Sequence, residues 1–267
     1  MTKARTIGSA VIATVVACGC GNKALSPGDV RHVDKDAEAM LQGLWVDRET
    51  EEAAFTVRGD TIFFPDSTTV PATFYVYGDT LYMDSARVTY HIVRLSRDIF
   101  TFTNQNSDVV SLVKSDSPPR GRDFSYKPPE APPVTEQVKS DTVVIHDGTR
   151  YHIYTAVNPT TFKVVKASYN SEGMKVESVF FDNIIHISIF TGTRQLFSRD
   201  FKKQMFSHLI PDTFLRQAVL TAIDYCKADS DGFHFNTVVC IPGDAGCYML
   251  DTIISTDGEV TMELMEY

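Results

Sequence analysis

Apolar and polar residues alternate along most of residues 38–114, a pattern typical of half-buried strands. The segments FTVRGDTIFF (55–64) and FYVYGDTLYM (74–83) share one plan, in which a Gly-Asp turn separates two aromatic and β-branched runs. Gly59 and Gly78 supply the positive φ that such hairpin turns require. With ARVTYHIVRL, DIFTFT and VVSLVK, the pattern predicts seven or eight short strands. We expect an antiparallel meander or a small barrel, because a sheet this size must hide its edges.

Strand patterns return from residue 138 onward and are interrupted once by a helical pattern. DTVVIHDGTRYHIYTA is typical of a hairpin around Asp147 and Gly148, and FKVVKASYN, MKVESVFF and NIIHISIF each have the length of a strand. In TFLRQAVLTAIDYCKA (213–228) the apolar residues recur at helical spacing, after Asp212 as a cap. Strands resume in FHFNTVVCI, CYMLDTIIS and EVTMELMEY. The fold class predicted for 138–267 is therefore α+β, an antiparallel sheet with one long helix on a face.

A proline-rich segment separates these two patterns. Residues 115–137 contain six of the twelve prolines. Prolines at this density favour extended polyproline II and exclude a helix or a central strand. We interpret the segment as a linker between two domains; a recognition strip for an aromatic groove is the alternative, since basic residues flank the prolines.

The N-terminus has the composition of a signal peptide. Lys3 and Arg5 precede an uncharged stretch, 6–17, that is shorter than the about 20 apolar residues of a membrane-spanning helix. The order Val-Val-Ala-Cys at its end resembles a bacterial lipobox. This resemblance implies cleavage after residue 17 and a diacylglycerol and palmitate anchor on Cys18, with Cys20 as the alternative. An uncleaved N-terminal anchor stays open as well.

The residues after the predicted lipid site bear on where the anchor lies. Gly19 follows Cys18 where many inner-membrane lipoproteins have Asp, which implies the outer membrane. No acidic cluster follows the cysteine, so we expect the periplasmic face, with the cell surface as the alternative. Residues 18–37 lack periodicity and are rich in turn formers, as expected of a lipidated tether.

Composition and charge limit the function classes. The chain is 43% hydrophobic and 11% aromatic, which is enough to build a folded core. The net charge of -9 and the lack of a Lys or Arg run argue against a nucleic-acid partner.

The segment LQGLWV carries a resemblance to a known family. Gly43, Leu44 and Trp45 stand in the order G-x-W, which resembles the first-strand motif of lipocalins and of short lipocalin-like domains in bacterial lipoproteins. The resemblance implies that Trp45 plugs one end of a barrel beneath an arginine from a late strand, for which Arg94 is our candidate, as a cation over the ring. A barrel this short need not hold a ligand. The half from residue 138 resembles a domain of unknown function that recurs in Gram-negative envelope lipoproteins, which implies no activity.

Three cysteines lie in the C-terminal half. Cys240 and Cys247 flank IPGDAG, so a hairpin would bring them together, and an oxidising compartment would allow a disulfide. Cys226 falls on the predicted helical stripe and is expected in the core. Pairing with Cys226 stays open, because connectivity does not follow from sequence.

Catalytic and metal-binding motifs are absent from the sequence of the mature chain, which has no H-E-x-x-H, G-x-S-x-G, phosphate-binding glycine loop or C-x-x-C. The histidines are scattered, and ADSDGF lacks the later ligands of a calcium loop. We therefore expect no cofactor, no metal and no enzyme activity. The leading hypothesis is a lipoprotein that binds an envelope protein or glycan, with Phe74, Tyr75, Tyr77 and Tyr82 as candidate contacts. A small-ligand carrier or a hydrolase is the alternative.

Overall fold

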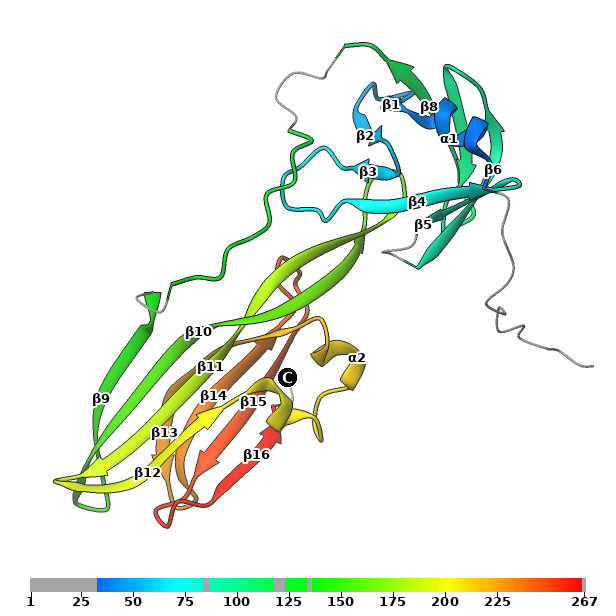
Figure 1. Cartoon of the computed structure of the whole chain (residues 1–267). Coiled ribbons are helices and arrows are strands. Elements are labelled where there is room, and N and C mark those ends of the chain that lie inside the picture. The colour runs from blue at the N-terminus through cyan, green and yellow to red at the C-terminus, as the bar shows by residue number, and fades with distance from the viewer. Residues whose placement is uncertain (1–32, 84–86, 118–122, 134–135, 266–267) are drawn as a thin grey trace, which may run out of the picture. The chain divides into compact units, whose positions relative to one another are not determined.

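The computed structural model describes residues 33–83, 87–117, 123–133 and 136–265 (Figure 1). These residues belong to one compact unit. Cys18, Cys20, the predicted signal peptide and most of the predicted tether lie outside the described residues. The predicted division into two domains joined by a linker stays a prediction.

An antiparallel barrel occupies the N-terminal part of the described chain. Each of its strands pairs with the next, and the first pairs with the last, so the sheet closes on itself (Figure 1). This confirms the predicted small β-barrel. The strands are β1 (Gly43–Asp47), β2 (Ala53–Arg58), β3 (Thr61–Phe63), β4 (Ala72–Tyr77), β5 (Thr80–Met83), β6 (Val88–Leu95), β7 (Ile99–Thr103) and β8 (Val109–Ser115).

Large side chains fill the interior of the barrel. The rings of Trp45, Phe55, Tyr90, Phe100 and Phe102 are each at most 1% exposed. They meet edge to face or stacked, with the Trp45 and Phe100 centroids 5.8 Å apart and those of Phe100 and Phe102 5.1 Å apart. Short strands leave a narrow interior, and these rings occupy it.

Helix α1 (Lys35–Leu41) precedes the barrel. The Asp34 carboxylate caps it by accepting a hydrogen bond from the Ala37 amide at 2.9 Å. Ala37 and Leu41 are buried in the barrel core. None of the helices among the described residues combines the length and apolarity that crossing a bilayer requires.

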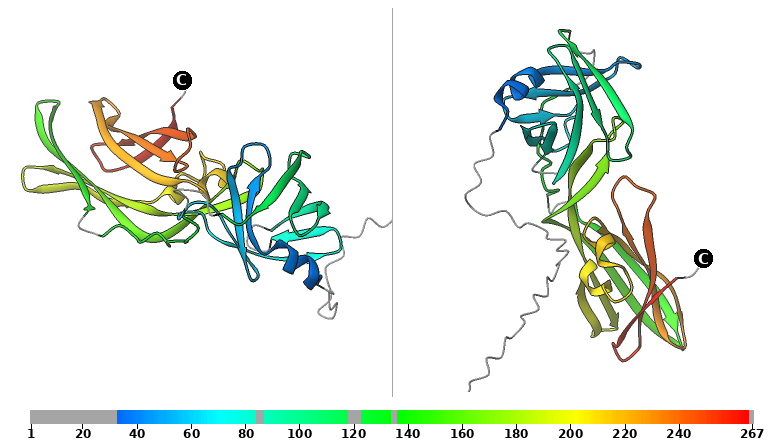
Figure 2. Two further views of the ribbon diagram at one scale, coloured as in Figure 1. Left: turned by 90° about the horizontal axis from the view of Figure 1, so that it is seen from above. Right: turned by 90° about the vertical axis from the view of Figure 1, so that its right-hand side faces the viewer.

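The C-terminal part consists of two antiparallel sheets, where the sequence predicts one sheet and a helix (Figures 1 and 2). They bury a common core, in which the rings of Tyr151 and Phe233 are 4.8 Å apart. The first sheet has the order β12-β11-β10-β9 and the second β13-β14-β15-β16. The strands are β9 (Val138–His146), β10 (Thr149–Tyr169), β11 (Lys175–Thr191), β12 (Arg194–Phe201), β13 (Val219–Asp229), β14 (Gly232–Cys240), β15 (Cys247–Ile254) and β16 (Val260–Leu264).

The predicted long helix at 213–228 is wrong. Only α2 (Asp212–Leu215) is helical there, after the 3-10 helix η2 (Lys203–Phe206), and the rest is strand β13. Two bulges interrupt the pairing of β13 with β14, one after Leu220 and one after Tyr225. Each bulge adds a residue to the strand, so the inward positions run 220, 223, 225 and 228. These steps of three, two and three residues obscure the strict alternation of a strand.

Strands β10 and β11 form one long hairpin that reaches the barrel core. Met174, at the end of its turn, and Val176 are buried in the core cluster of the barrel. The Tyr90 hydroxyl accepts a hydrogen bond from the Lys175 amide at 2.7 Å. The strand segments predicted in this region are therefore confirmed as strand. Nearly all of FKVVKASYN belongs to the single long strand β10, and nearly all of MKVESVFF and the whole of NIIHISIF belong to β11.

The described part of the proline-rich segment, 123–133, contains no helix or strand. Its Lys127 amide donates a hydrogen bond to the Ser67 carbonyl at 2.9 Å. Pro128 and Pro129 line a cavity with Val179 and Phe180 of β11. The segment therefore packs against the folded part at this point.

Candidate functional site

Trp45 lies at one end of the barrel, beside helix α1. Its ring is fully buried, and its Nε1 donates a hydrogen bond to the Leu41 carbonyl at 2.7 Å. The Lys114 ammonium lies 5.0 Å from the ring centroid and donates to the Met40 carbonyl at 2.8 Å. Both carbonyls belong to the last turn of α1, where the helix itself supplies no donor. The hydrogen bonds of Trp45 and Lys114 therefore hold α1 against this end of the barrel.

Lys114, and not Arg94, is the cation over the tryptophan ring. Lys114 is the Cα partner of Trp45 in the pairing of β1 with β8 that closes the barrel. Arg94 lies on β6, where it is exposed and pairs with Thr101. Burial lowers the pKa of Lys114. Trp45 and Lys114 together close this end of the barrel. The Trp45 Nε1 and the Lys114 ammonium both donate hydrogen bonds to α1.

A second group of aromatic residues lies on the outside of the barrel. Phe74 is buried, but Tyr75, Tyr77 and Tyr82 point outward from β4 and β5, and we call these three the tyrosine face. Tyr77 is 47% exposed. Tyr75 and Tyr82 are cross-strand partners, and their rings stack with centroids 4.7 Å apart and an interplanar angle of 3°.

The tyrosine face has the properties of a contact surface. Tyrosine offers a large ring and a hydroxyl at low cost in side-chain entropy, and it is enriched at the energetic centres of interfaces. The stacked pair is already ordered on a rigid hairpin, so binding need not order it. On the neighbouring strand β6 the outward positions Thr89, His91 and Val93 continue the exposed surface.

A cleft lies in the C-terminal part, where β10 bulges. The register of β10 against β11 shifts between Pro159 and Lys163, so that residues 160–162 stand opposite Asp182 alone. The Thr160 hydroxyl donates to the Asp182 carbonyl at 2.6 Å and accepts from the Phe162 amide at 3.1 Å, which fixes the bulge. A cavity of 320 Å³ opens beside it, and we call it the bulge cleft. Its lining includes Phe162, Lys163, Asn183, Lys202, Lys203 and Gln204.

A buried ion pair forms the floor of the bulge cleft. Lys203 and Asp182 are 7% and 5% exposed, and their Nζ and Oδ2 atoms are 3.5 Å apart. The Lys203 ammonium also donates to the Ala218 carbonyl at 2.6 Å, while Asp182 Oδ1 accepts from the Leu220 amide at 3.0 Å. Asn183 Nδ2 donates to the Leu220 carbonyl at 2.9 Å. This network ties β11 and η2 to the start of β13.

Sequence reasoning missed this network. Its signal is weak: Asp182 interrupts the apolar stretch FFDNII, and Lys203 lies between the apolar residues of FKKQMF. A charged side chain at a buried position needs a partner, because burying an unpaired charge is costly. Finding the partner, however, requires the long-range pairing of η2 with β11.

A serine, histidine and aspartate cluster lies on the outer face of β11 and β12. His186 Nδ1 is 2.7 Å from Asp200 Oδ1, and Nε2 is 2.8 Å from the Ser188 hydroxyl and 3.2 Å from that of Ser198. These distances match those of a nucleophile, base and orienting acid. The Asp200 side chain, however, is 60% exposed, and water at that position weakens its electrostatic effect on the imidazole. We interpret the cluster as cross-strand hydrogen bonding.

His234 lies between two carboxylates in the second sheet. It is 5% exposed, with Nδ1 2.7 Å from Asp251 Oδ2 and Nε2 2.8 Å from Asp229 Oδ1. Ionised carboxylates only accept hydrogen bonds, so both ring nitrogens must carry protons. Burial lowers the pKa of His234, but its hydrogen bonds to Asp251 and Asp229 outweigh burial and the net pKa is raised. Hydrogen bonds from Lys227 and His234 lower the pKa of Asp229.

The raised pKa of His234 predicts a pH-dependent stability. The contribution of its ionised form is fully present below the ordinary histidine pKa of about 6.5 and is lost as the pH rises through the raised value. We expect His234→Gln to lower the free energy of unfolding by about 1.5–3 kcal/mol at pH 6, the range for hydrogen bonds to charged groups, and by less at pH 9. Denaturant titrations at several pH values measure this difference.

The matched control is His208→Gln, at an exposed histidine. Its unfolding free energy should follow that of the unchanged protein at every pH. A difference between His234→Gln and the unchanged protein that is constant or grows with pH would contradict the assignment of an ionised His234.

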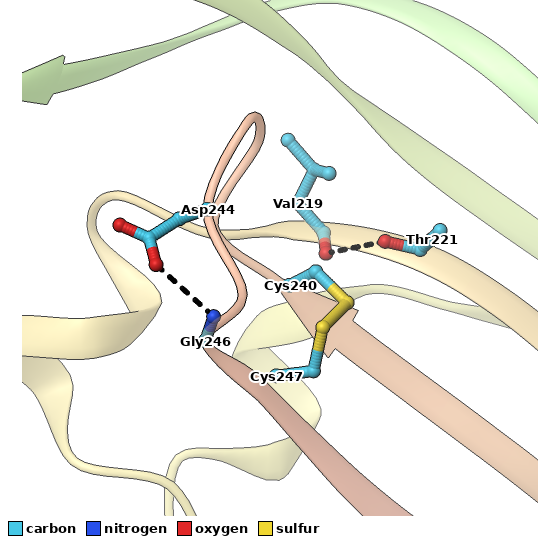
Figure 3. The surroundings of a disulfide bond; sticks show 6 residues. All are labelled: Val219, Thr221, Cys240, Asp244, Gly246 and Cys247. Atoms are coloured by element: carbon cyan, nitrogen blue, oxygen red, sulfur yellow. Dashed lines mark hydrogen bonds between the residues drawn. A yellow bond between two sulfur atoms is a disulfide. The ribbon is translucent and has the colours of Figure 1, made fainter.

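Cys240 and Cys247 are joined by a disulfide at the hairpin between β14 and β15 (Figure 3). They are Cα partners in the strand pairing, and Asp244 in the turn accepts a hydrogen bond from the Gly246 amide at 3.2 Å (Figure 3). The bond closes a short loop and so fixes the hairpin tip. The expectation for Cys226 is wrong, because this free cysteine is exposed on β13.

The segment ADSDGF, which partly resembles a calcium loop, forms a turn in the structure. Asp229 and Asp231 lie at the turn from β13 into β14, where the Asp231 amide donates to Asp229. Within the described ranges, no group of three or more His, Cys, Asp and Glu side chains is arranged to hold a metal ion.

Comparison with known proteins adds a family for the C-terminal part. A search of curated proteins finds no match. Residues 120–262, more than half of the chain and including most of both C-terminal sheets, match a family described as a domain of unknown function. The chain therefore belongs to the family of the domain of unknown function DUF4738.

Proposed function

We propose that this protein is a non-enzymatic envelope lipoprotein that binds a protein or glycan partner through the tyrosine face of its barrel. A lipid on Cys18, or on Cys20 as the alternative, anchors it in the outer membrane, facing the periplasm. The proposal requires no cofactor. The anchor rests on the order Val-Val-Ala-Cys after an uncharged N-terminal stretch.

The observation that carries the proposal is the placement of aromatic residues on both sides of the barrel wall. Inward-facing rings fill the interior, whereas Tyr75, Tyr77 and Tyr82 face outward together on one hairpin. A surface of this kind, partly apolar and rich in tyrosine, is typical of interaction sites. A partner on the outside fits this arrangement.

The alternative is a carrier that encloses a small ligand in the barrel, as the resemblance to lipocalins implies. A carrier needs an apolar cavity with a few converging polar groups. Trp45, Phe100 and Phe102 are fully buried in the barrel core, where the Phe100 ring contacts both of the others. This filling favours an external partner over an enclosed ligand.

Photo-crosslinking tests the proposal in the cells that make the protein. With the photoreactive residue benzoylphenylalanine at position 77 of the full chain, we expect a discrete adduct. The adduct should disappear when Tyr75→Thr and Tyr82→Thr are added, because threonine keeps the strand propensity but removes both rings.

The matched control has benzoylphenylalanine at position 145, where Ile145 is 77% exposed on β9. The same adduct formed from position 145, or an adduct from position 77 that survives the double threonine variant, would contradict the role of the tyrosine face.

A further inference from the structure

More lysines than carboxylates line the bulge cleft, although the chain as a whole is acidic. The chain has a net charge of -9, but three lysines, Lys163, Lys202 and Lys203, line this one cavity beside a single carboxylate, that of Asp182. Lys203 is paired with Asp182. Lys163 and Lys202 are exposed, and neither forms an ion pair with another described residue. The cleft therefore offers two uncompensated ammonium groups to a ligand.

The cleft also offers an apolar ring and an amide. Phe162 is 58% exposed on the bulge, where the hydrogen bonds of Thr160 hold its backbone. The Gln204 side chain is exposed beside it on η2. A phosphate ion would use the ammonium groups alone. An exposed aromatic ring beside them fits a ligand that has both an apolar face and an acidic group, as an acidic sugar does.

The size of the cleft suits one small unit, and a neighbouring cavity extends it. Ligand pockets measure about 300–1,000 Å³, and 320 Å³ is at the lower end. A second cavity, of 310 Å³, shares Lys203 and Gln204 with the first and continues past Ser207 to Asp212 and Arg216, whose side chains form an ion pair at 3.0 Å. Two adjoining cavities of similar size fit consecutive units of a chain molecule.

The local backbone disfavours an acidic peptide as the occupant. Peptides commonly bind by adding a strand to a regular sheet edge. At the cleft β10 is bulged and the edge strand β12 ends at Phe201, so no regular edge continues there.

We propose that the bulge cleft binds an acidic oligosaccharide, with Lys163 and Lys202 on its carboxylates and Phe162 against a sugar ring. This inference goes beyond the proposed function, because the cleft lies on the C-terminal sheets and the tyrosine face on the barrel. Either site can fail without the other.

Isothermal titration calorimetry with the full chain in detergent tests the inference. The probes are tetragalacturonate, the neutral galactose tetramer and a tetraglutamate peptide. We expect tetragalacturonate to bind about tenfold or more tightly than the other two, and its binding to weaken as the salt concentration rises. Lys163→Ala/Lys202→Ala and, separately, Phe162→Ala should each weaken it about tenfold.

The matched control is Lys139→Ala/Arg150→Ala, which removes two exposed cations from the same sheet away from the cleft. It should leave the affinity unchanged within about twofold. The inference is overturned if tetragalacturonate does not bind, if both double variants weaken it equally, or if tetraglutamate binds more tightly, which would assign the cleft to acidic peptides.

Discussion

Replacing Lys203 by Met should lower the free energy of unfolding by about 3–5 kcal/mol, because it leaves the Asp182 carboxylate buried without its cation. The Ala218 carbonyl also loses its donor. Guanidinium unfolding of the full chain, followed by circular dichroism, measures the change. Trp45 is the single tryptophan and lies in the barrel, so its fluorescence reports on the barrel separately.

Two further variants separate charge from packing. In Asp182→Asn/Lys203→Met both charges are gone, and the side-chain amide oxygen at position 182 can still accept from the Leu220 amide. The loss of unfolding free energy in the double variant should therefore be smaller than the sum of the losses in Asp182→Asn and Lys203→Met. Lys202→Met, at the exposed neighbour, should change the unfolding free energy by no more than about 0.5 kcal/mol. Equal effects of Lys203→Met and Lys202→Met would show that the buried pair does not stabilise the fold.

Replacing Cys18 by Ser should abolish lipid attachment and release the protein from the membrane. Stable anchoring needs two or more acyl chains, each methylene contributing about 0.8 kcal/mol, and serine cannot accept the thioether-linked lipid. Growth with labelled palmitate measures attachment, and fractionation of the envelope measures release. We expect the label to fall to background and the chain to become soluble.

Cys20→Ser is the matched control, two residues away. It should keep the label and the membrane association. If Cys20→Ser loses the label and Cys18→Ser keeps it, the alternative cysteine carries the lipid. If neither variant changes labelling, the lipid-anchor proposal is wrong.

The barrel could be predicted because its information is local. The Gly-Asp turns at Gly59 and Gly78 fix where the chain reverses, and both glycines adopt positive φ, of 63° and 56°. Alternation between the turns then fixes which side chains face inward. Closure of β1 on β8 follows from the need to hide edges, but the register that sets Lys114 opposite Trp45 is a long-range property.

The error at β13 has a physical cause that the sequence conceals. Bulges after Leu220 and Tyr225 break the two-residue period of the strand, so its inward positions no longer alternate strictly. The β-branched and aromatic residues Val219, Thr221, Ile223 and Tyr225 are typical of strands and were the available contrary signal. Strand propensity and the spacing of apolar residues gave different predictions here, and the segment forms a strand because it pairs with β14.

The tyrosine face and the bulge cleft differ in how far they could be predicted from the sequence. The tyrosine face was predictable, because alternation assigns Tyr75 and Tyr77 to the outer side of the sheet. The same alternation assigns Phe74 to the interior, where it is buried. The bulge cleft was not predictable, because it brings together residues of β10, β11 and η2; Pro159 is a local sign of a bulge but does not indicate which segments meet there.

Native mass spectrometry of the full chain carrying Cys18→Ser, washed at high salt to remove ions from the surface, tests the central claim that the partner is held outside a filled barrel. The account predicts the mass of the bare polypeptide. A reproducible additional mass from an apolar small molecule, lost when the barrel unfolds, would contradict it and make the protein a carrier.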